Sequence, residues 1–598
     1  MAPVRSSESK QALRPGPSAL LLLFVCVLTW LGGGAAIAQS ERSPSADEAQ
    51  PEEFFEVIDV DLVNIDVWVT DRNGNPIGGL TKEDFIVLRD KKPIEISNFY
   101  AVADGRDVTS RTASVLEQPS EPLETSTETL VAQELLAEEE VAPEHRLWLI
   151  VYIDNYNLDP IERDRVLPGV REFLARTLKG DDRAMVVSFD RGLEVLQPFT
   201  RAGSNLFSAL DDVRGVTGHE GLRRRQQAET LQRIDRARTQ SQALGWALQY
   251  AEEQLDNIRR TTEAMERMIE SLAGLPGRKA FVHVSSGVPM LAGEEMFHAV
   301  GEKFNSSEAY AEIPRYAASR DFERLNQHAN AHRVSFYTLD AGGMRGLHFS
   351  GAEYAGFINP RLRTTLDSIV PENLQSSLRF MAEETGGQAI VNRNEVMPAL
   401  QKAALDFRSF YSLGITSAGE DSGSYHEIQV KLSTPNRKLR VRHRGGYRSK
   451  NTDARVRETL RSALLYSHQA NPLGIDVTWG VPERQSGSSD YILPIQLRIP
   501  MNDIVLLPVG GGRHETRLRL FVGAAGKDGE LSQIDDAPLG LRIADENVEA
   551  AKGEALIHGH RLRLGPGRKK VGIALVDLFG HEVSVVTSFQ QIGAEQPR

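Results

Sequence analysis

The sequence has one cysteine in 598 residues, and it lies near the amino terminus. A single cysteine cannot form a disulfide within the chain. Cys26 also stands inside a run of apolar residues that continues after it, which argues against a lipid-attachment site. We therefore expect a mature chain that is stable without disulfides, even in an oxidising compartment.

An excess of positive charge and a membrane-length apolar run are also missing. The formal net charge is −13, and no strongly basic stretch could follow a phosphate backbone, so we expect no nucleic-acid partner. Much of the acidity lies in residues 112–144, which hold nine Glu and neither Lys nor Arg. The largely apolar run from Ala19 to Leu31 is short for a membrane span. We therefore expect no membrane-spanning segment in the chain after signal cleavage.

The first 38 residues have the three parts of a secretory signal. A basic start precedes the apolar run, and the small-x-small motif Ala36-Ile37-Ala38 follows it. We predict cleavage before Gln39 and export to the periplasm or the extracellular space; an uncleaved anchor is the alternative. Residues 39–53, rich in Ser, Pro, Glu and Asp, are predicted to form a disordered leader.

The length of the chain and its changes in composition predict several domains. Alternating apolar residues over 54–103 indicate a small β-sandwich-like domain, and residues 104–144 form an acidic linker. Residues 145–448 carry the pattern of an α/β domain. A linker helix is expected over 449–470. Six short alternating runs in 471–598 indicate a C-terminal β-sandwich of the Ig-like kind.

The α/β pattern is clearest around Asp154. Seven apolar residues, Leu147 to Ile153, precede it and predict a strand buried on both faces. Asp159 and Pro160 then mark the start of a helix, and Glu162 stands three residues past the cap, as in a capping box. A second apolar strand follows at 184–189. This βαβ unit predicts a parallel sheet covered by helices.

These residues resemble a von Willebrand factor type A (VWA) domain, and more narrowly the VWFA-related proteins of the acidobacterial type. The resemblance covers roughly residues 55–450 and implies a Rossmann-like, parallel-rich sheet between helices. It also implies a protein-binding function. Its further marks are Leu275-Pro276-Gly277-Arg278-Lys279, Glu384-Thr385-Gly386-Gly387 and Arg444-Gly445-Gly446-Tyr447.

A long helical segment interrupts this pattern at about 222–275. Apolar or neutral residues recur from 244 to 272 in alternating steps of four and three, which is the spacing of a coiled-coil seam. Such a helix would be about 40 Å long, too long to lie wholly on one small domain. We therefore predict a projecting helix or helical hairpin, which ends at Pro276-Gly277.

The resemblance implies a divalent-cation site of the form Asp-x-Ser-x-Ser with a distant Thr and Asp, and this sequence keeps little of it. Asp154 matches the first ligand, but Tyr156 and Leu158 replace the two serines. Ser285-Ser286-Gly287 stands where the family has Thr-Asp-Gly. Two interpretations remain open: Mg²⁺ or Ca²⁺ held by Asp154, Asn157, Asp190 and Thr217, or Asp154 as a cap of the following turn, with no cofactor.

The sequence favours a non-catalytic, exported protein-binding or adhesion-type module with a degenerate metal-ion-dependent adhesion site. Open α/β sheets bind ligands outside the carboxyl ends of their strands. One alternative is metal-dependent adhesion through Asp154. A second is an envelope hydrolase that uses Ser285 or Ser286, because this segment imitates a nucleophile elbow without its first glycine. The predicted partner-binding crevice comprises Asp154, Asn155, Tyr156, Asn157, Ser285 and Ser286.

Overall fold

The computed structural model describes residues 62–103, 106–107, 146–216, 218–345, 349, 351, 354, 356–417, 423–527 and 529–593. The predicted signal and leader lie outside the described residues, as do Thr217 and the acidic linker except for a two-residue strand, β5 (Arg106–Asp107). The fold is mixed α/β. No helix of the described part of the chain combines the length and the apolar character that a membrane crossing requires.

The central sheet has six strands in the order β11-β10-β9-β6-β7-β8. All pairings are parallel except that of β8 with β7. Every residue of β6 is buried, so the predicted buried strand with parallel neighbours is confirmed. The strands are β6 (Leu147–Asp154), β7 (Arg183–Phe189), β8 (Leu193–Thr200), β9 (Arg278–Ser285), β10 (Val334–Asp340) and β11 (Gln388–Ile390).

Helices cover both faces of this sheet because β6 is apolar from Leu147 to Ile153. Leu149, Val151 and Ile153 pack under α3 (Pro160–Thr177), α4 (Gly203–Val213) and α11 (Met397–Ala404). Trp148, Ile150 and Tyr152 pack under α6 (Gln240–Ser271), α9 (Ser319–Ala331) and the end of α10 (Pro360–Glu384). Each such buried side chain stabilises the fold by about 1.5–3 kcal/mol.

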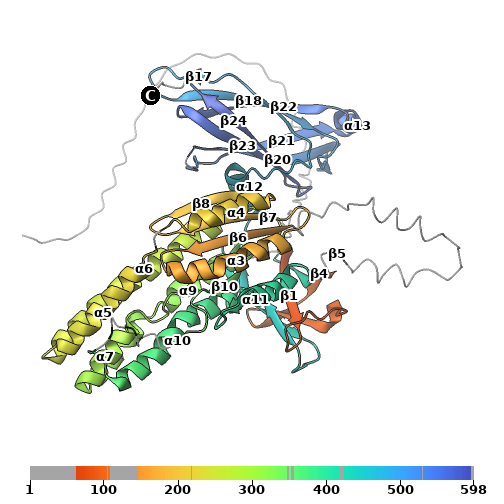
Figure 1. The fold of residues 1–598 in the computed structure, drawn as a ribbon. Helices are drawn as coiled ribbons and strands as arrows, with labels where there is room; N and C mark the ends of the chain where they lie inside the picture. Colours follow the sequence, from red (N-terminus) through yellow and green to blue (C-terminus); the bar gives the residue numbers. More distant parts are fainter. Residues whose placement is uncertain are drawn as a thin grey trace, which may run out of the picture. The chain divides into compact units, whose positions relative to one another are not determined.

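The segment predicted as a helical insertion forms two helices, α5 (Glu220–Arg236) and α6 (Gln240–Ser271). Figure 1 shows them running side by side with α7 (Glu294–Phe304) and α10 (Pro360–Glu384), and these helices share one apolar cluster. A short helix, α8 (Ser307–Glu312), follows α7. The predicted seam faces the domain: Ile258, Met265 and Ile269 contact the sheet cluster. The predicted helical hairpin is therefore present as α5 and α6, and α7 and α10, which the sequence did not indicate beside it, complete the helical extension.

The small β domain is larger than predicted, and its boundary at 103 is wrong. Strands from 410–448, predicted to close the α/β domain, pair instead with the N-terminal strands. One sheet has the order β14-β1-β12-β4-β5 and the other β15-β13-β2-β3. The strands are β1 (Leu62–Thr70), β2 (Phe85–Arg89), β3 (Lys92–Ile94), β4 (Ile96–Ala103), β12 (Phe410–Thr416), β13 (Tyr425–Leu432), β14 (Arg440–His443) and β15 (Gly446–Arg448).

The predicted linker helix is present as α12 (Thr452–Tyr466), and two antiparallel sheets follow it. Leu460 and Leu464 of α12 pack on Phe521 and Ala574 of the second sheet. The strands are β16 (Asp476–Trp479), β17 (Glu483–Arg484), β18 (Tyr491–Pro500), β19 (Leu507–Pro508), β20 (Arg513–Ala525), β21 (Asp535–Ala544), β22 (Ala555–Leu564), β23 (Gly567–Asp577) and β24 (Val583–Ile592), with α13 (Val548–Lys552) before β22.

Candidate functional site

Asp154 lies at the carboxyl end of β6, and its side chain is completely buried. One oxygen, Oδ1, accepts hydrogen bonds from the backbone N–H of Asn157 at 3.2 Å and from its Nδ2 at 3.1 Å. The other, Oδ2, accepts from Ser285 Oγ at 2.9 Å and from Asn157 Nδ2 at 2.9 Å. The carboxylate therefore caps the turn after β6 and ties it to the end of β9, as the second of the two interpretations predicts.

Two arginines bring positive charge to this buried network. Arg163 of α3 donates from Nη1 to Asn155 Oδ1 at 3.2 Å, and Arg223 of α5 donates from Nη1 to Asn157 Oδ1 at 2.8 Å. Burial lowers the pKa of Arg223, but the carboxylate of Glu220, with smaller effects of Tyr250 and Asp154, raises it, and the pKa is raised overall. Arg223 thus stays charged beside Asp154, where it offsets the buried negative charge.

Of the four residues predicted to hold a metal, the structure shows two, Asp154 and Asn157, in direct contact. Asp190 forms an ion pair with His219 Nε2 at 2.7 Å. Thr217 lies outside the described residues. Within the described ranges, no group of three or more His, Cys, Asp or Glu is arranged to hold a metal ion.

The predicted crevice is closed to solvent at five of its six residues. Asp154, Asn155 and Ser285 are fully buried, Asn157 and Ser286 nearly so, and Tyr156 alone is partly exposed. The cause is the helical extension, since Arg223 of α5 and Thr261 of α6 both contact Asn157. A ligand on this side of the sheet would meet the side chains that lie over the crevice.

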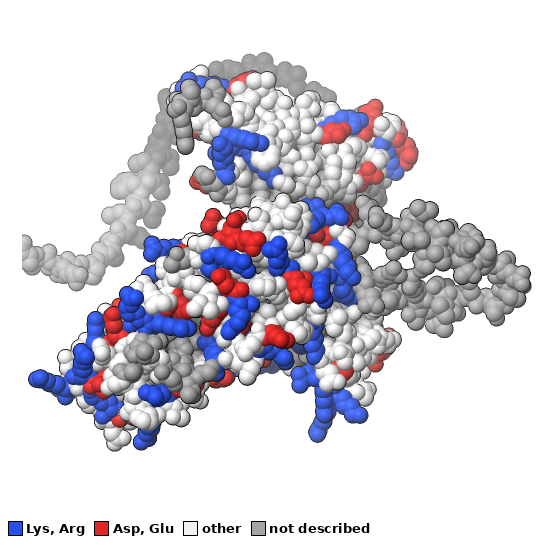
Figure 2. Space-filling view, in the orientation of Figure 1, with Lys and Arg blue, Asp and Glu red and all other residues white. Residues whose placement is uncertain are grey.

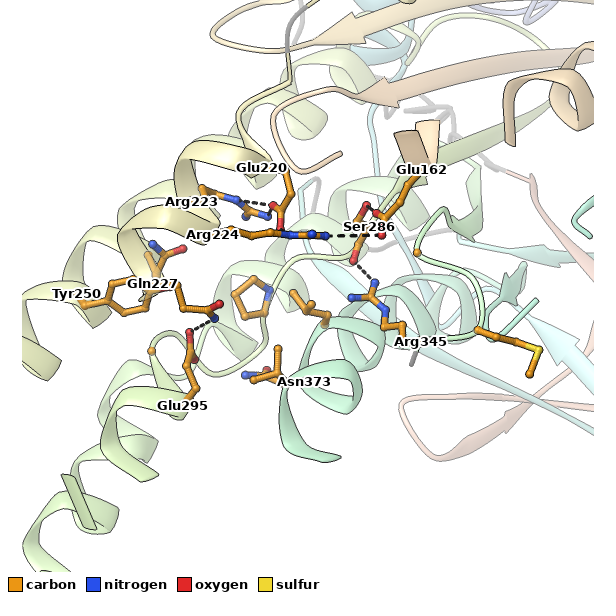
Figure 3. Close-up of a pocket in the computed structure, with 17 residues that line it drawn as sticks. Glu162, Glu220, Arg223, Arg224, Gln227, Tyr250, Ser286, Glu295, Arg345 and Asn373 are labelled. Carbon is orange, nitrogen blue, oxygen red and sulfur yellow. Dashed lines mark hydrogen bonds and ion pairs between the residues drawn. The ribbon is translucent and has the colours of Figure 1, made fainter. Parts of the chain in front are cut away.

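Those side chains line a pocket of about 250 Å³ beside the carboxyl ends of β9 and β10 (Figure 3). We call it the mixed-charge pocket. Its walls come from α3, from the loops after β9 and β10, and from the helical extension α5, α6, α7 and α10. Its lining residues include Glu162, Glu220, Arg223, Arg224, Gln227, Tyr250, Ser286, Glu295, Met344, Arg345 and Asn373.

Three carboxylates and three guanidinium groups balance each other in this pocket. Glu162 Oε2 accepts a hydrogen bond from Ser286 Oγ at 2.5 Å, and its Oε1 lies 3.8 Å from Arg224 Nη2. Arg345 donates from Nη2 to Asp340 Oδ1 at 2.8 Å and also contacts the carbonyl oxygen of Ser286. The pocket therefore offers fixed donors and acceptors of both signs without a net charge.

On the opposite wall, polar groups of α5, α6 and α7 meet. Gln227 donates from Nε2 to Glu295 Oε1 at 2.9 Å. Burial raises the pKa of Tyr250 well above its usual value, and the charge of Glu295 raises it further. Tyr250 is therefore a neutral phenol at physiological pH and is suited to hydrogen bonding rather than to acid–base chemistry.

The face of the α/β domain seen in Figure 2 shows Lys and Arg interspersed with Asp and Glu, and no continuous patch of one sign. A surface that follows a nucleic-acid backbone gathers its basic residues on one face or along one stripe. The visible face lacks this arrangement.

No family model and no curated protein sequence matches the chain. Among solved structures, it is similar to a structural-genomics target named SoR45, with 13% identity and a TM-score of 0.15 over 22% of this chain and 97% of that one. It is also similar to the pilus adhesin SpaC from Lactobacillus rhamnosus GG in its open conformation. That match has 8% identity and a TM-score of 0.23, over 75% of this chain and 52% of that one. At these TM-scores neither match supports a conclusion about the fold or the function of this chain.

The carboxyl group of Glu294, next to the pocket residue Glu295, makes stability depend on pH. Burial, and then the charge of Glu295, raise the pKa of Glu294 from 4.5 to about 7. The folded chain thus holds more protons than the unfolded chain between these values, so stability falls as pH rises from about 4.5 to 7. We expect Glu294→Gln to raise the free energy of unfolding by about 1–2 kcal/mol at pH 8, allowing for partial exposure, and to leave it unchanged at pH 4.

Hydrogen exchange of the α7 amides at pH 4 and pH 8 measures this difference as a change in their opening free energy. An equal gain at both pH values would contradict the argument, because the gain would then have a cause other than the titration of Glu294.

Sequence reasoning missed most of the pocket. Glu162 was assigned to a capping box, but its carboxylate reaches Ser286 in the loop after β9. Arg345 lies between β10 and α10, in a segment where the sequence analysis identified no site residue. A signal for α10 was present, because Asn359 and Pro360 repeat the cap-then-proline pattern of Asp159 and Pro160.

Proposed function

We propose that this chain is an exported, non-catalytic binding module with a degenerate VWA-type α/β domain, and that its recognition site is the mixed-charge pocket. The ligand we infer is a segment of a protein partner that carries both a carboxylate and a cationic group. One observation carries the proposal: three carboxylates and three guanidiniums line one cavity of about 250 Å³ beside the strand ends. Export is supported by the signal pattern of residues 1–38 alone.

The chemistry of the lining supports a peptide-like ligand. Arg224 lies between Glu162 and Glu220, at 3.8 and 3.3 Å, so an incoming carboxylate can share its guanidinium. Glu295 accepts from Gln227 through one oxygen, which leaves acceptor capacity for an ammonium or guanidinium group. At the rim, Met344 is 67% exposed and offers an adaptable apolar contact.

The geometry at the two serines supports a non-catalytic role. In a serine triad the histidine lies between the nucleophile and the acid. Here Ser285 donates its hydrogen bond directly to Asp154, and His283 Nε2 lies 3.4 Å from the same carboxylate. All three side chains are fully buried. Ser286 donates to Glu162, which is a weak base for activating a hydroxyl.

A peptide-display selection on the full chain tests the pocket directly. We expect enriched peptides to carry charges of both signs and to bind Arg224→Ala about tenfold more weakly, because one hydrogen bond to a charged group is lost. Fluorescence anisotropy with the enriched peptides measures the affinities.

The matched control is Arg498→Ala, which removes a 56%-exposed arginine of β18 that also pairs with a carboxylate. It should leave peptide affinity unchanged. Peptides that bind Arg224→Ala as tightly as the wild type, or a selection that enriches nothing, would overturn the mixed-charge pocket as the recognition site.

A further inference from the structure

A second cavity, of about 240 Å³, lies at the opposite end of the α/β sheet, beside the amino ends of β9 and β10. We call it the basic cavity. Its walls are the turn 273–277, the end of α9, the start of β1, the segment from Arg444 to Lys450 and the first half of α12. Six cations line it against one carboxylate, Glu458. The six are Lys279, Arg333, Arg444, Arg448, Lys450 and Arg455.

Two of these cations are buried, and only part of their hydrogen-bonding capacity is used. Lys279 is 3% exposed, and its Nζ donates to the carbonyl oxygen of His332 at 3.2 Å. Arg444 is 8% exposed; its Nη1 and Nη2 donate to the carbonyl oxygens of Asn330 and Asn64, while its Nε has no hydrogen-bond partner among the described residues. The buried Nε of Arg333 also has no partner there. Buried donors are normally paired, so these atoms indicate a missing acceptor.

The carboxylates near the cavity are too few to balance its charge. Glu458 Oε2 pairs with Lys450 Nζ at 2.8 Å, and Asp66 Oδ2 lies 3.6 Å from Arg333. No carboxylate of the described part of the chain lies within ion-pair distance of Lys279. Burial, and then the charges of Arg333 and Lys450, lower the pKa of Lys279 well below its usual value. Burial and Arg333 likewise lower the pKa of Arg444 to about 10.

We propose that the basic cavity binds a small oxyanion with two or more charges, a phosphate group in chemical class. Guanidinium and ammonium N–H groups that converge from several elements match the oxygens of a tetrahedral phosphate. The anion would supply the missing acceptor and offset the mutual repulsion of the cations. This site is independent of the mixed-charge pocket, since the length of β9 separates Lys279 from Ser286.

Calorimetric titration of the full chain with inorganic phosphate, at constant ionic strength set with chloride, tests the site. We expect saturable binding with one phosphate per chain. Lys279→Met should bind about 10- to 100-fold more weakly, the factor for one lost hydrogen bond between charged groups. The variant keeps the length of the side chain and removes a buried charge, so it is expected to fold; circular dichroism checks this. Arg455→Gln, on the partly exposed rim, is a second variant and should also weaken binding.

Lys570→Met is the matched control. Lys570 is another buried lysine whose Nζ donates to a backbone carbonyl, that of Ala463, but it lies outside the cavity. This variant should keep wild-type phosphate affinity. A parallel titration with glycerol phosphate, with glycerol as the blank, distinguishes a phosphate ester from free phosphate as the natural ligand. If glycerol phosphate binds more tightly than inorganic phosphate, the ligand is a phosphate ester. If it binds more weakly, the ligand is the free anion. Absence of saturable phosphate binding, or wild-type affinity in both Lys279→Met and Arg455→Gln, would overturn the proposal.

Discussion

Asp154→Ala is expected to lower the stability of the α/β domain by about 3–5 kcal/mol, the range for removing one partner from a buried charged pair. The substitution removes the acceptor of Ser285 Oγ and the main acceptor of Asn157 Nδ2, and it removes one of the negative charges that act on Arg223, which keeps its ion pair with Glu220. Hydrogen exchange of the β6 amides in EDTA measures the effect as a fall in their opening free energy. This local probe suits a chain with several cores, whose unfolding need not be two-state.

Asp190→Ala is the matched control, because Asp190 follows the neighbouring strand β7 and pairs with His219 near the surface. Its side chain is 30% exposed, so the loss should be about 1 kcal/mol or less. Equal losses for the two substitutions would contradict the role of Asp154 as the buried centre of the network.

Gly287→Ala is expected to destabilise the same domain by about 3 kcal/mol. Gly287 has φ +92, which is costly for any residue with a Cβ atom. An added Cβ would also lie 2.5 Å from the carbonyl oxygen of Leu374, so the loop after β9 and the backbone of α10 would have to separate. Because Ser286 and Leu374 both line the mixed-charge pocket, the substitution should also weaken peptide binding.

Gly356→Ala is the control that measures the strain of a positive φ without a steric clash. Gly356 has nearly the same φ, +91, but nothing lies within 4 Å of the added Cβ. Hydrogen exchange should show a loss of about 1–2 kcal/mol at most for this variant, which reports backbone strain alone. If both substitutions lower the stability by the same amount, the close approach of Gly287 to α10 contributes nothing to the loss.

Local patterns predicted the elements around Asp154 because the residues that determine them are neighbours in sequence. Seven apolar residues defined β6, and Asp159 with Pro160 marked the start of α3, where Asp159 accepts from the N–H of Ile161 at 2.8 Å. The heptad-like spacing over 244–272 also correctly predicted a long helix, α6. What that spacing could not reveal was the partner, since an apolar seam packs equally well on a second helix or on a sheet face.

Strand partners could not be predicted for the same reason. The strands over 410–448 were expected to belong to the α/β domain of residues 145–448, but β12 pairs with β1, from which more than 300 residues separate it. Consecutive elements are neighbours in most folds, so the prediction placed these strands in the nearer domain. His558-Gly559-His560 lies inside β22 opposite β18, so a glycine between two polar residues interrupts the alternating pattern but not the strand.

The candidate site depends on such long-range contacts almost entirely. Glu162 and Ser286 are 124 residues apart, and Arg223 reaches Asn157 over 66 residues. The sequence placed Asp154 and Ser285 at neighbouring strand ends because parallel strands bring their carboxyl ends together. It did not indicate that α5 and α6 would cover those ends and move the accessible surface to the mixed-charge pocket.

We propose that the chain's own side chains Asn157 and Ser285 occupy the place beside Asp154 where a VWA-type site would hold a divalent cation, and that Arg223, bonded to Asn157, adds positive charge nearby. The most direct measurement is hydrogen exchange of the β6 amides in wild type and Asp154→Ala, in EDTA and then in millimolar Mg²⁺, Mn²⁺ or Ca²⁺. We predict that no cation changes the opening free energy of either protein. Slower exchange in wild type with any of these ions, lost in Asp154→Ala, would contradict the account and restore metal-dependent adhesion through Asp154.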